Sequence, residues 1–74
     1  MIVIDRVETD WDGTIQRYII RSNERLLLQN IDYHLDFHPH DNRIVEVGDG
    51  FEMAVSPDEM SKILSRFSYS YFKE

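Results

Sequence analysis

Six residues near the middle of the chain, Tyr33 to His38, alternate apolar or aromatic side chains with polar and ionisable ones. This period of two is typical of a β-strand, in which successive side chains point to opposite faces of a sheet. If Tyr33, Leu35 and Phe37 face a core, the residues between them must lie on the other face. The pattern therefore predicts a sheet with one buried face and a second face on which function should be sought.

Turn-forming residues recur at short intervals along the rest of the chain, and the segments between them are rich in Val, Ile, Leu, Tyr and Phe. We interpret these segments as an antiparallel β-meander of five or six strands. The expected strands cover residues 2–9, 14–21, 25–30, 33–38, 43–47 and 51–55.

The period changes after Ser56, where the sequence predicts one C-terminal α-helix over residues 57–70. Ser56 is a favoured helix cap, Pro57 fits the first turn, and Glu59 stands at the capping-box position. Apolar residues then recur at spacings of three and four, which gives the helix one apolar stripe to pack on the sheet. The stripe consists of Met60, Ile63, Leu64, Phe67 and Tyr71.

Pairing the strands across the expected turns predicts which side chains share the helix-covered face. On that face we expect Val3 beside Ile20, Val45 beside Met53, and Val47 beside Phe51. The same pairing places Glu46 directly opposite Glu52 on the other face.

The length of 74 residues predicts a single α+β domain, residues 1–74, with a thin core. A chain this short buries only about 60% of the surface it exposes when unfolded. Because the chain has no cysteine, no disulfide supports that core, and we expect a homodimer.

Consecutive apolar residues at 2–4, 19–20 and 26–28 place apolar groups on both faces of the expected sheet. Either the sheet curls into a half-barrel that buries the second face, or a partner covers it. Trp11, in an expected hairpin tip, is a second candidate contact because exposed tryptophan often anchors interfaces. The candidate interface residues are Ile4, Arg6, Trp11, Arg17, Ile19 and Leu27.

Histidine and carboxylate side chains on the later strands are a candidate site for a divalent metal ion. The candidate ligands are His34, Asp36, His38 and Glu46. A solvated polar strand face explains the same residues without metal, so the expected cofactor is none and the metal site is the alternative.

The net charge of −6 argues against direct binding of nucleic acid, whose phosphates a negative field repels. Six of the eight basic residues are arginines, which suit fixed paired contacts with another protein. We find no signal peptide and no membrane-spanning run, so a cytoplasmic protein is expected.

These observations favour a small, acidic, non-enzymatic protein-interaction or regulatory module of bacterial or phage type. A metal-binding protein or metal-dependent enzyme is the first alternative. An acidic mimic of nucleic acid that inhibits a DNA-binding protein is the second.

Overall fold

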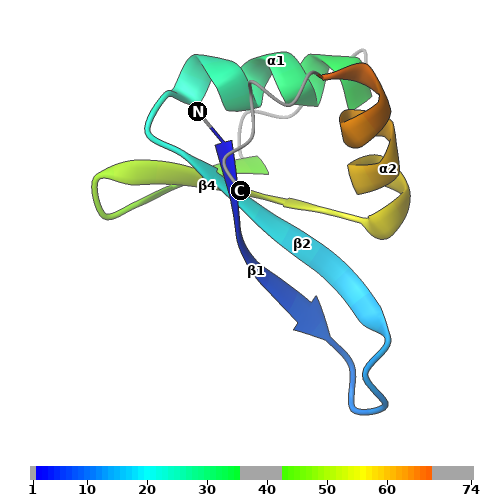
Figure 1. The fold of residues 1–74 in the computed structure, drawn as a ribbon. Coiled ribbons are helices and arrows are strands. Elements are labelled where there is room, and N and C mark those ends of the chain that lie inside the picture. Colours follow the sequence, from blue (N-terminus) through cyan, green and yellow to red (C-terminus); the bar gives the residue numbers. More distant parts are fainter. Residues whose placement is uncertain (1, 36–42, 68–74) are drawn as a thin grey trace.

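The computed structural model describes residues 2–35 and 43–67 and has an α+β fold (Figure 1). Four strands form one antiparallel sheet in the order β1-β2-β4-β3. Two helices lie on one face of this sheet, and the other face is called the open face below. The elements are β1 (Ile2–Thr9), β2 (Ile15–Ser22), α1 (Arg25–Leu35), β3 (Ile44–Val47), β4 (Gly50–Val55) and α2 (Pro57–Arg66).

The sheet is open, with β1 and β3 at its edges, so the half-barrel alternative is wrong. It is also not a simple meander, because β4 lies between β2 and β3. The long β1–β2 hairpin extends well beyond the part of the sheet that the helices cover (Figure 1). Its tip is therefore separated from the body of the molecule.

Helix α1 replaces two of the predicted strands, residues 25–30 and the first half of residues 33–38. The remainder of the second predicted strand lies outside the described residues. Leu28, Ile31 and Asp32 are the buried residues of α1, and their spacing of three and four is that of one helix face. Leucine is a strong helix former, so the apolar run that we assigned to a two-sided strand suits a helix equally well. The backbone enters α1 through a turn in which the Glu24 N–H donates to Ser22 Oγ at 3.0 Å.

The core lies between the two helices and the covered face of the sheet. Removing such side chains from water supplies most of the driving force for folding. The core cluster consists of Ile2, Ile20, Leu28, Ile31, Met53, Val55, Met60 and Ile63, each at most 3% exposed.

The β3–β4 turn sets a register that differs by one residue from the predicted one. Val47 pairs with Gly50, which leaves a two-residue turn whose first residue, Gly48, has φ +62°. Because Asp49, the second central residue, has no positive φ, this is a hairpin turn of type II′, which favours glycine at the first position. A shift of one residue moves every side chain of a strand to the other face. Val45 and Val47 therefore lie on the open face and not in the core, contrary to our expectation.

The same register overturns the predicted pair of glutamates. Glu46 stands opposite Phe51, and Val45 is the residue opposite Glu52. The like-charge contact across this hairpin is absent as a result.

Strand β1 contains an irregularity at Asp5 that changes which of its side chains reach the open face. Ile4 pairs with Ile20, but the next pair is Arg6 with Ile19, so Asp5 is an additional residue in β1. Such a β-bulge re-aims the side chains that follow it. Val3 stands opposite Arg21, not Ile20 as predicted, and Ile4 shares the side of the core residue Ile20.

Helix α2 begins as the sequence predicts. The Glu59 N–H donates to Ser56 Oγ at 3.1 Å and the Ser56 N–H donates to Glu59 Oε1 at 2.9 Å, which completes the capping box. The helix ends at Arg66, earlier than predicted, because Phe67 has an extended backbone while its N–H still donates to the Ile63 carbonyl at 2.9 Å.

Candidate functional site: the open sheet face

A groove of about 350 Å³ runs across the open face, over all four strands. Its lining combines apolar side chains with charged ones. The apolar lining comprises Ile19, Val45, Val47, Met53 and Ala54, and the charged lining comprises Arg6, Glu8, Arg17, Arg43 and Glu52.

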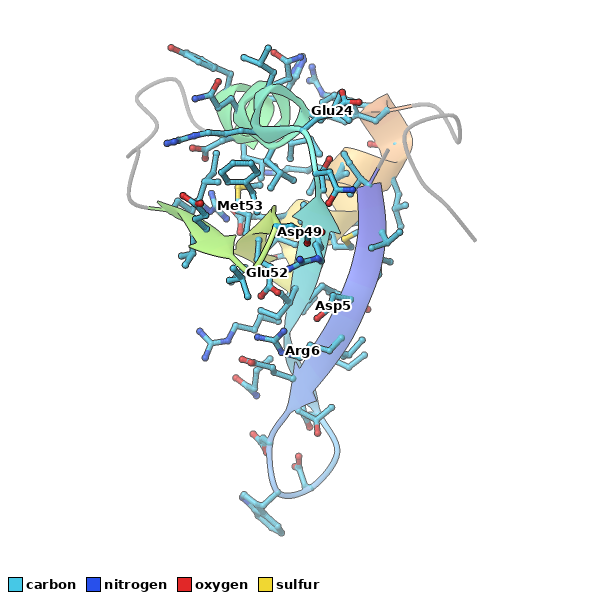
Figure 2. All side chains as sticks on the ribbon, turned by 90° about the vertical axis from the view of Figure 1, so that its left-hand side faces the viewer. Asp5, Arg6, Glu24, Asp49, Glu52 and Met53 are labelled. Carbon is cyan, nitrogen blue, oxygen red and sulfur yellow. The ribbon has the colours of Figure 1, made fainter. Side chains whose placement is uncertain are left out.

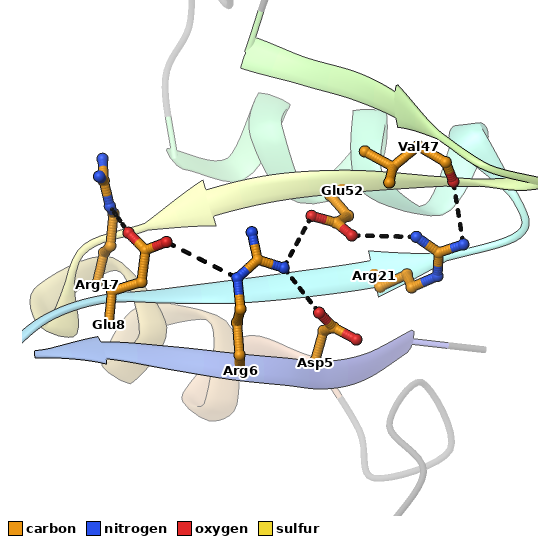
Figure 3. A network of polar contacts seen from close by, with 7 residues as sticks. All are labelled: Asp5, Arg6, Glu8, Arg17, Arg21, Val47 and Glu52. Atoms are coloured by element: carbon orange, nitrogen blue, oxygen red, sulfur yellow. Dashed lines mark hydrogen bonds and ion pairs between the residues drawn. The ribbon is translucent and has the colours of Figure 1, made fainter.

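Glu52 is the centre of a network of ion pairs on this face (Figure 3). Its Oε2 accepts from Arg21 Nη1 at 3.1 Å and its Oε1 accepts from Arg6 Nη1 at 3.2 Å. The Glu52 side chain is only 12% exposed, whereas that of Arg6 is 51% exposed. Figure 2 shows Arg6 and Glu52 close together on this face. A largely covered carboxylate thus anchors arginines from two neighbouring strands.

The network continues along β1 and β2 in both directions. Arg6 also contacts Asp5, 2.8 Å away, and Glu8, 3.8 Å away, and Glu8 pairs with Arg17 across the hairpin. The hydrogen bond to Asp5, with the charge of Glu52, raises the pKa of Arg6 above its ordinary value. Arg6 is therefore held in its charged form at the edge of the groove.

Arg21 fixes the other end of the network to the β3–β4 turn. Its Nη2 donates to the Val47 carbonyl at 3.0 Å and contacts Asp49 Oδ1 at 3.2 Å. A side chain on Gly50 would approach within 3.1 Å of the same guanidinium, so glycine leaves the space that Arg21 occupies.

Arg43 borders the groove and connects it to both helices. Its Nη1 lies 3.3 Å from Asp32 Oδ1 in α1, and its Nη2 lies 2.5 Å from Glu59 Oε1 in α2. The same nitrogen donates to the Ala54 carbonyl in β4 at 3.2 Å. Burial favours the neutral form of Arg43, but the hydrogen bond and charge of Glu59, with Asp32, outweigh it and raise the pKa. Arg43 therefore links both helices to the sheet and also lines the rim of the groove.

Ile19 shows how the apolar floor of the groove is partly covered. The register places it between Arg6 on β1 and Ala54 on β4, and it is only 6% exposed. Arginine stems commonly cover apolar surface while their charged ends stay in water. Val45 and Val47, at the opposite side of the groove, are 53% and 40% exposed. The accessible apolar surface of the groove therefore lies on β3.

Three of the predicted interface residues, Arg6, Arg17 and Ile19, are brought together in this groove. Leu27 is not near them in the sheet, because it belongs to α1 and packs against the core. Ile4 is on the side of Ile20 and is 44% exposed. The predicted apolar cluster of Ile4, Ile19 and Leu27 therefore does not form.

Trp11 lies at the tip of the β1–β2 hairpin and is 96% exposed. The tip is ordered by backbone hydrogen bonds from Asp10 to Thr14 at 2.9 Å and from Gly13 to Asp10 at 3.0 Å. Asp12 Oδ1 also accepts from the Thr14 N–H at 3.0 Å. Hydrogen bonding with the Thr14 side chain, together with this backbone bond, lowers the pKa of Asp12. A well-ordered turn thus holds a fully exposed tryptophan between two aspartates.

His34 and Glu46, the two predicted metal ligands that the structure describes, do not share a strand face. His34 belongs to α1, where its ring meets that of Phe67 edge-on with centroids 5.0 Å apart, and Glu46 lies on β3. Asp36 and His38 lie outside the described residues. Among residues 2–35 and 43–67, no group of three or more histidine or carboxylate side chains could hold a metal ion.

Sequence reasoning missed Val45 and Val47 as residues of this face and assigned them to the core. The signal that could have placed them is the Gly48-Asp49 pair, read as a two-residue turn and not as part of a longer loop.

Within the described residues, no helix is long and apolar enough to cross a lipid bilayer. Comparisons with models of protein families, with curated proteins and with solved structures found no match to this chain.

Proposed function

We propose that this chain is a protein-interaction module that binds another protein chain through its open sheet face. The observation that carries the proposal is the groove itself. The apolar side of the groove, on β3, is accessible because within the described residues neither helix covers it. Accessible apolar surface framed by polar groups is a common mark of a contact site.

The charged residues that line the groove favour a protein as the ligand. Each arginine on the groove already has a carboxylate partner, so the face carries arranged donors and acceptors of both signs. Such an arrangement can align with the mixed charges of another protein surface and exclude mismatched partners. Arginine is also enriched at the centres of protein interfaces.

Photocrosslinking tests this proposal. A benzophenone amino acid replaces Val47 on the groove in one variant and Lys62, exposed on α2, in a control. We expect the position 47 variant, irradiated in the cells that express it, to join one defined polypeptide that mass spectrometry identifies. The same adduct should form with that polypeptide in purified form, and excess wild-type chain should suppress it while a Val45→Asp chain should not.

The control at position 62 distinguishes adducts formed by specific binding from adducts formed by random collision. Equal adducts from positions 47 and 62, or none from position 47, would contradict a binding role for the open face.

A further inference from the structure

Trp11, at the tip of the β1–β2 hairpin, is exposed and takes no part in the core. Its exposed fraction of 96% is the largest among the exposed large hydrophobic residues of the described chain. The hydrogen bonds that form the tip come from the backbone and from the side chains of its neighbours, not from the indole. A tryptophan in this position contributes apolar surface that folding does not use, and tryptophan is among the commonest anchors of protein interfaces.

The backbone and side chains around Trp11 form a compact network of hydrogen bonds. The Asp12 N–H donates to Asp10 Oδ1 at 3.4 Å, and Gln16 Nε2 donates to Asp10 Oδ2 at 3.0 Å. These contacts add to the hydrogen bonds that Thr14 forms with Asp10 and Asp12. A partner therefore meets a turn that is already formed, and the tip loses little further conformational freedom on binding.

Asp10 and Asp12, on either side of Trp11, carry negative charges that no cation offsets within residues 2–35 and 43–67. In this part of the chain their carboxylates accept only from uncharged groups, namely backbone N–H groups and the Gln16 amide. Hydrogen bonding with Thr14 lowers the pKa of Asp12, so this carboxyl is ionised at neutral pH. The tip thus differs from the groove, where each arginine is paired with a carboxylate.

We propose that the hairpin tip is a second contact site, at which Trp11 enters an apolar pocket bordered by lysine or arginine side chains on another protein. The apolar ring between two uncompensated carboxylates is complementary to such a pocket. The same carboxylates would be repelled by the phosphates of nucleic acids and by anionic lipid surfaces. The open face of a second copy does not offer a basic rim either, because its arginines are already paired.

The shape of the molecule suits insertion of the tip. The hairpin extends beyond the body of the sheet (Figure 1), so Trp11 can enter a recess on a partner before the two bodies collide. A tryptophan buries about 150–250 Å² in such a recess. This site is separate from the groove on the open face and does not depend on it.

Photocrosslinking from the tip identifies the partner. A benzophenone amino acid replaces Trp11 in one variant, which keeps an aromatic group at the tip, and Leu26 in a control. Leu26 is 72% exposed and belongs to α1, at the opposite end of the molecule from the hairpin tip (Figure 1). We expect position 11, but not position 26, to join one defined polypeptide when the cells that express the variants are irradiated.

Binding to that polypeptide in purified form tests the role of the indole. Trp11→Ala should weaken binding by at least about 30-fold, the size expected for an interface anchor. The urea midpoint of the chain should not change, because the indole takes no part in the core. Leu26→Ala, the matched control, should bind as the wild type does.

Association kinetics test the charges of the tip. Asp12→Asn keeps the oxygen that accepts from the Thr14 N–H but removes the negative charge. It should lower the association rate constant and make this constant less dependent on salt, since charges at the rim of an interface act mainly on association. Asp58→Asn removes one charge from the exposed start of α2 and should associate as the wild type does.

Three results would overturn the inference. Position 11 could give no adduct, or only the adducts that position 26 gives, which would mean that the tip has no specific partner. Trp11→Ala could bind the purified polypeptide as tightly as the wild type, which would mean that the indole is not the anchor. Vesicles of phosphatidylcholine could shift the emission of Trp11 to shorter wavelength, which would assign the tip to a lipid surface. None of these results involves position 47, so the proposed function is tested separately.

Discussion

The Arg43 side chain contacts three elements of the fold, α1, α2 and β4. Its guanidinium meets Asp32 and Glu59 and also donates to the Ala54 carbonyl. Asp32 is only 3% exposed, and a buried carboxylate is costly unless charge or hydrogen bonds compensate it. Planar guanidinium groups, with their several donors, suit such three-way contacts better than lysine does.

Arg43→Met should therefore destabilise the fold by about 1.5–3 kcal/mol, the range for hydrogen bonds to charged groups. Arg66→Met is the control, because it removes an exposed arginine whose helix-end position is worth about 0.3–1 kcal/mol. Urea unfolding of the two variants measures the difference. Equal losses would show that the Arg43 contacts contribute no more than an exposed charge.

Glu59 makes the stability depend on pH. Burial favours its neutral form, but the hydrogen bond from Arg43 and the Ser56 N–H outweigh this and lower its pKa below the ordinary value of 4.5. A carboxyl with a lowered pKa in the folded state contributes stability above its unfolded pKa and loses it as the pH falls through the folded value. The free energy of unfolding should decrease between about pH 6 and pH 3 for this reason.

Glu59→Gln should flatten this part of the pH profile, since glutamine retains the capping-box geometry but does not titrate. Asp58→Asn removes the same charge from the same turn of α2 without altering a residue that contacts Arg43. It should therefore reduce the pH dependence of the free energy of unfolding less than Glu59→Gln does. Urea midpoints measured across the pH range compare the two. A profile for Glu59→Gln as steep as that of the wild type would contradict the role of this carboxyl.

At the scale of elements, patterns among neighbouring residues were sufficient to predict β1, β2, β4 and the start of α2. Ser56 and Glu59 specify a helix start through contacts that span three residues, and that prediction is confirmed. Helix α1 was missed because its leucine run and the alternation after Tyr33 fit either period, so tertiary packing decides between them. The face of β3 was missed because one residue in the turn length inverts a strand.

Leu26 and Leu28 distinguish the two interpretations of this segment. In a strand they would share a face, whereas in α1 Leu26 is 72% exposed and Leu28 is 0% exposed. Leu28→Ala should therefore cost about 2–5 kcal/mol and Leu26→Ala no more than about 0.5 kcal/mol. Thermal or urea unfolding of both variants measures this, and similar losses for the two would favour the strand.

At the scale of the whole molecule, the sheet has helices on one face only, and the apolar core is correspondingly small. The sequence predicted a thin core from length, and from paired apolar residues a second face that either curls into a half-barrel or is covered by a partner. Of the side chains predicted for that face, Arg6, Arg17 and Ile19 lie there, but Leu27 does not. The groove depends on the Asp5 bulge and on the β3–β4 turn, which together decide which residues face outward. A backbone irregularity of one residue hardly alters the periodicity of a sequence, and for that reason the sequence could predict the site only in part.

A thin core makes folding and association depend on each other in the homodimer that we predict from the length of the chain. When unfolding also separates two chains, the unfolding midpoint rises with protein concentration, because mass action favours the assembled state. Each tenfold increase in concentration should add about 1.4 kcal/mol to the stability of the dimer. We expect the urea midpoint of the wild type to rise over a hundredfold range of concentration, and that of Val45→Asp, altered on the open face, to stay constant. Identical, constant midpoints for both chains would show that the fold is stable without a second copy on its open face.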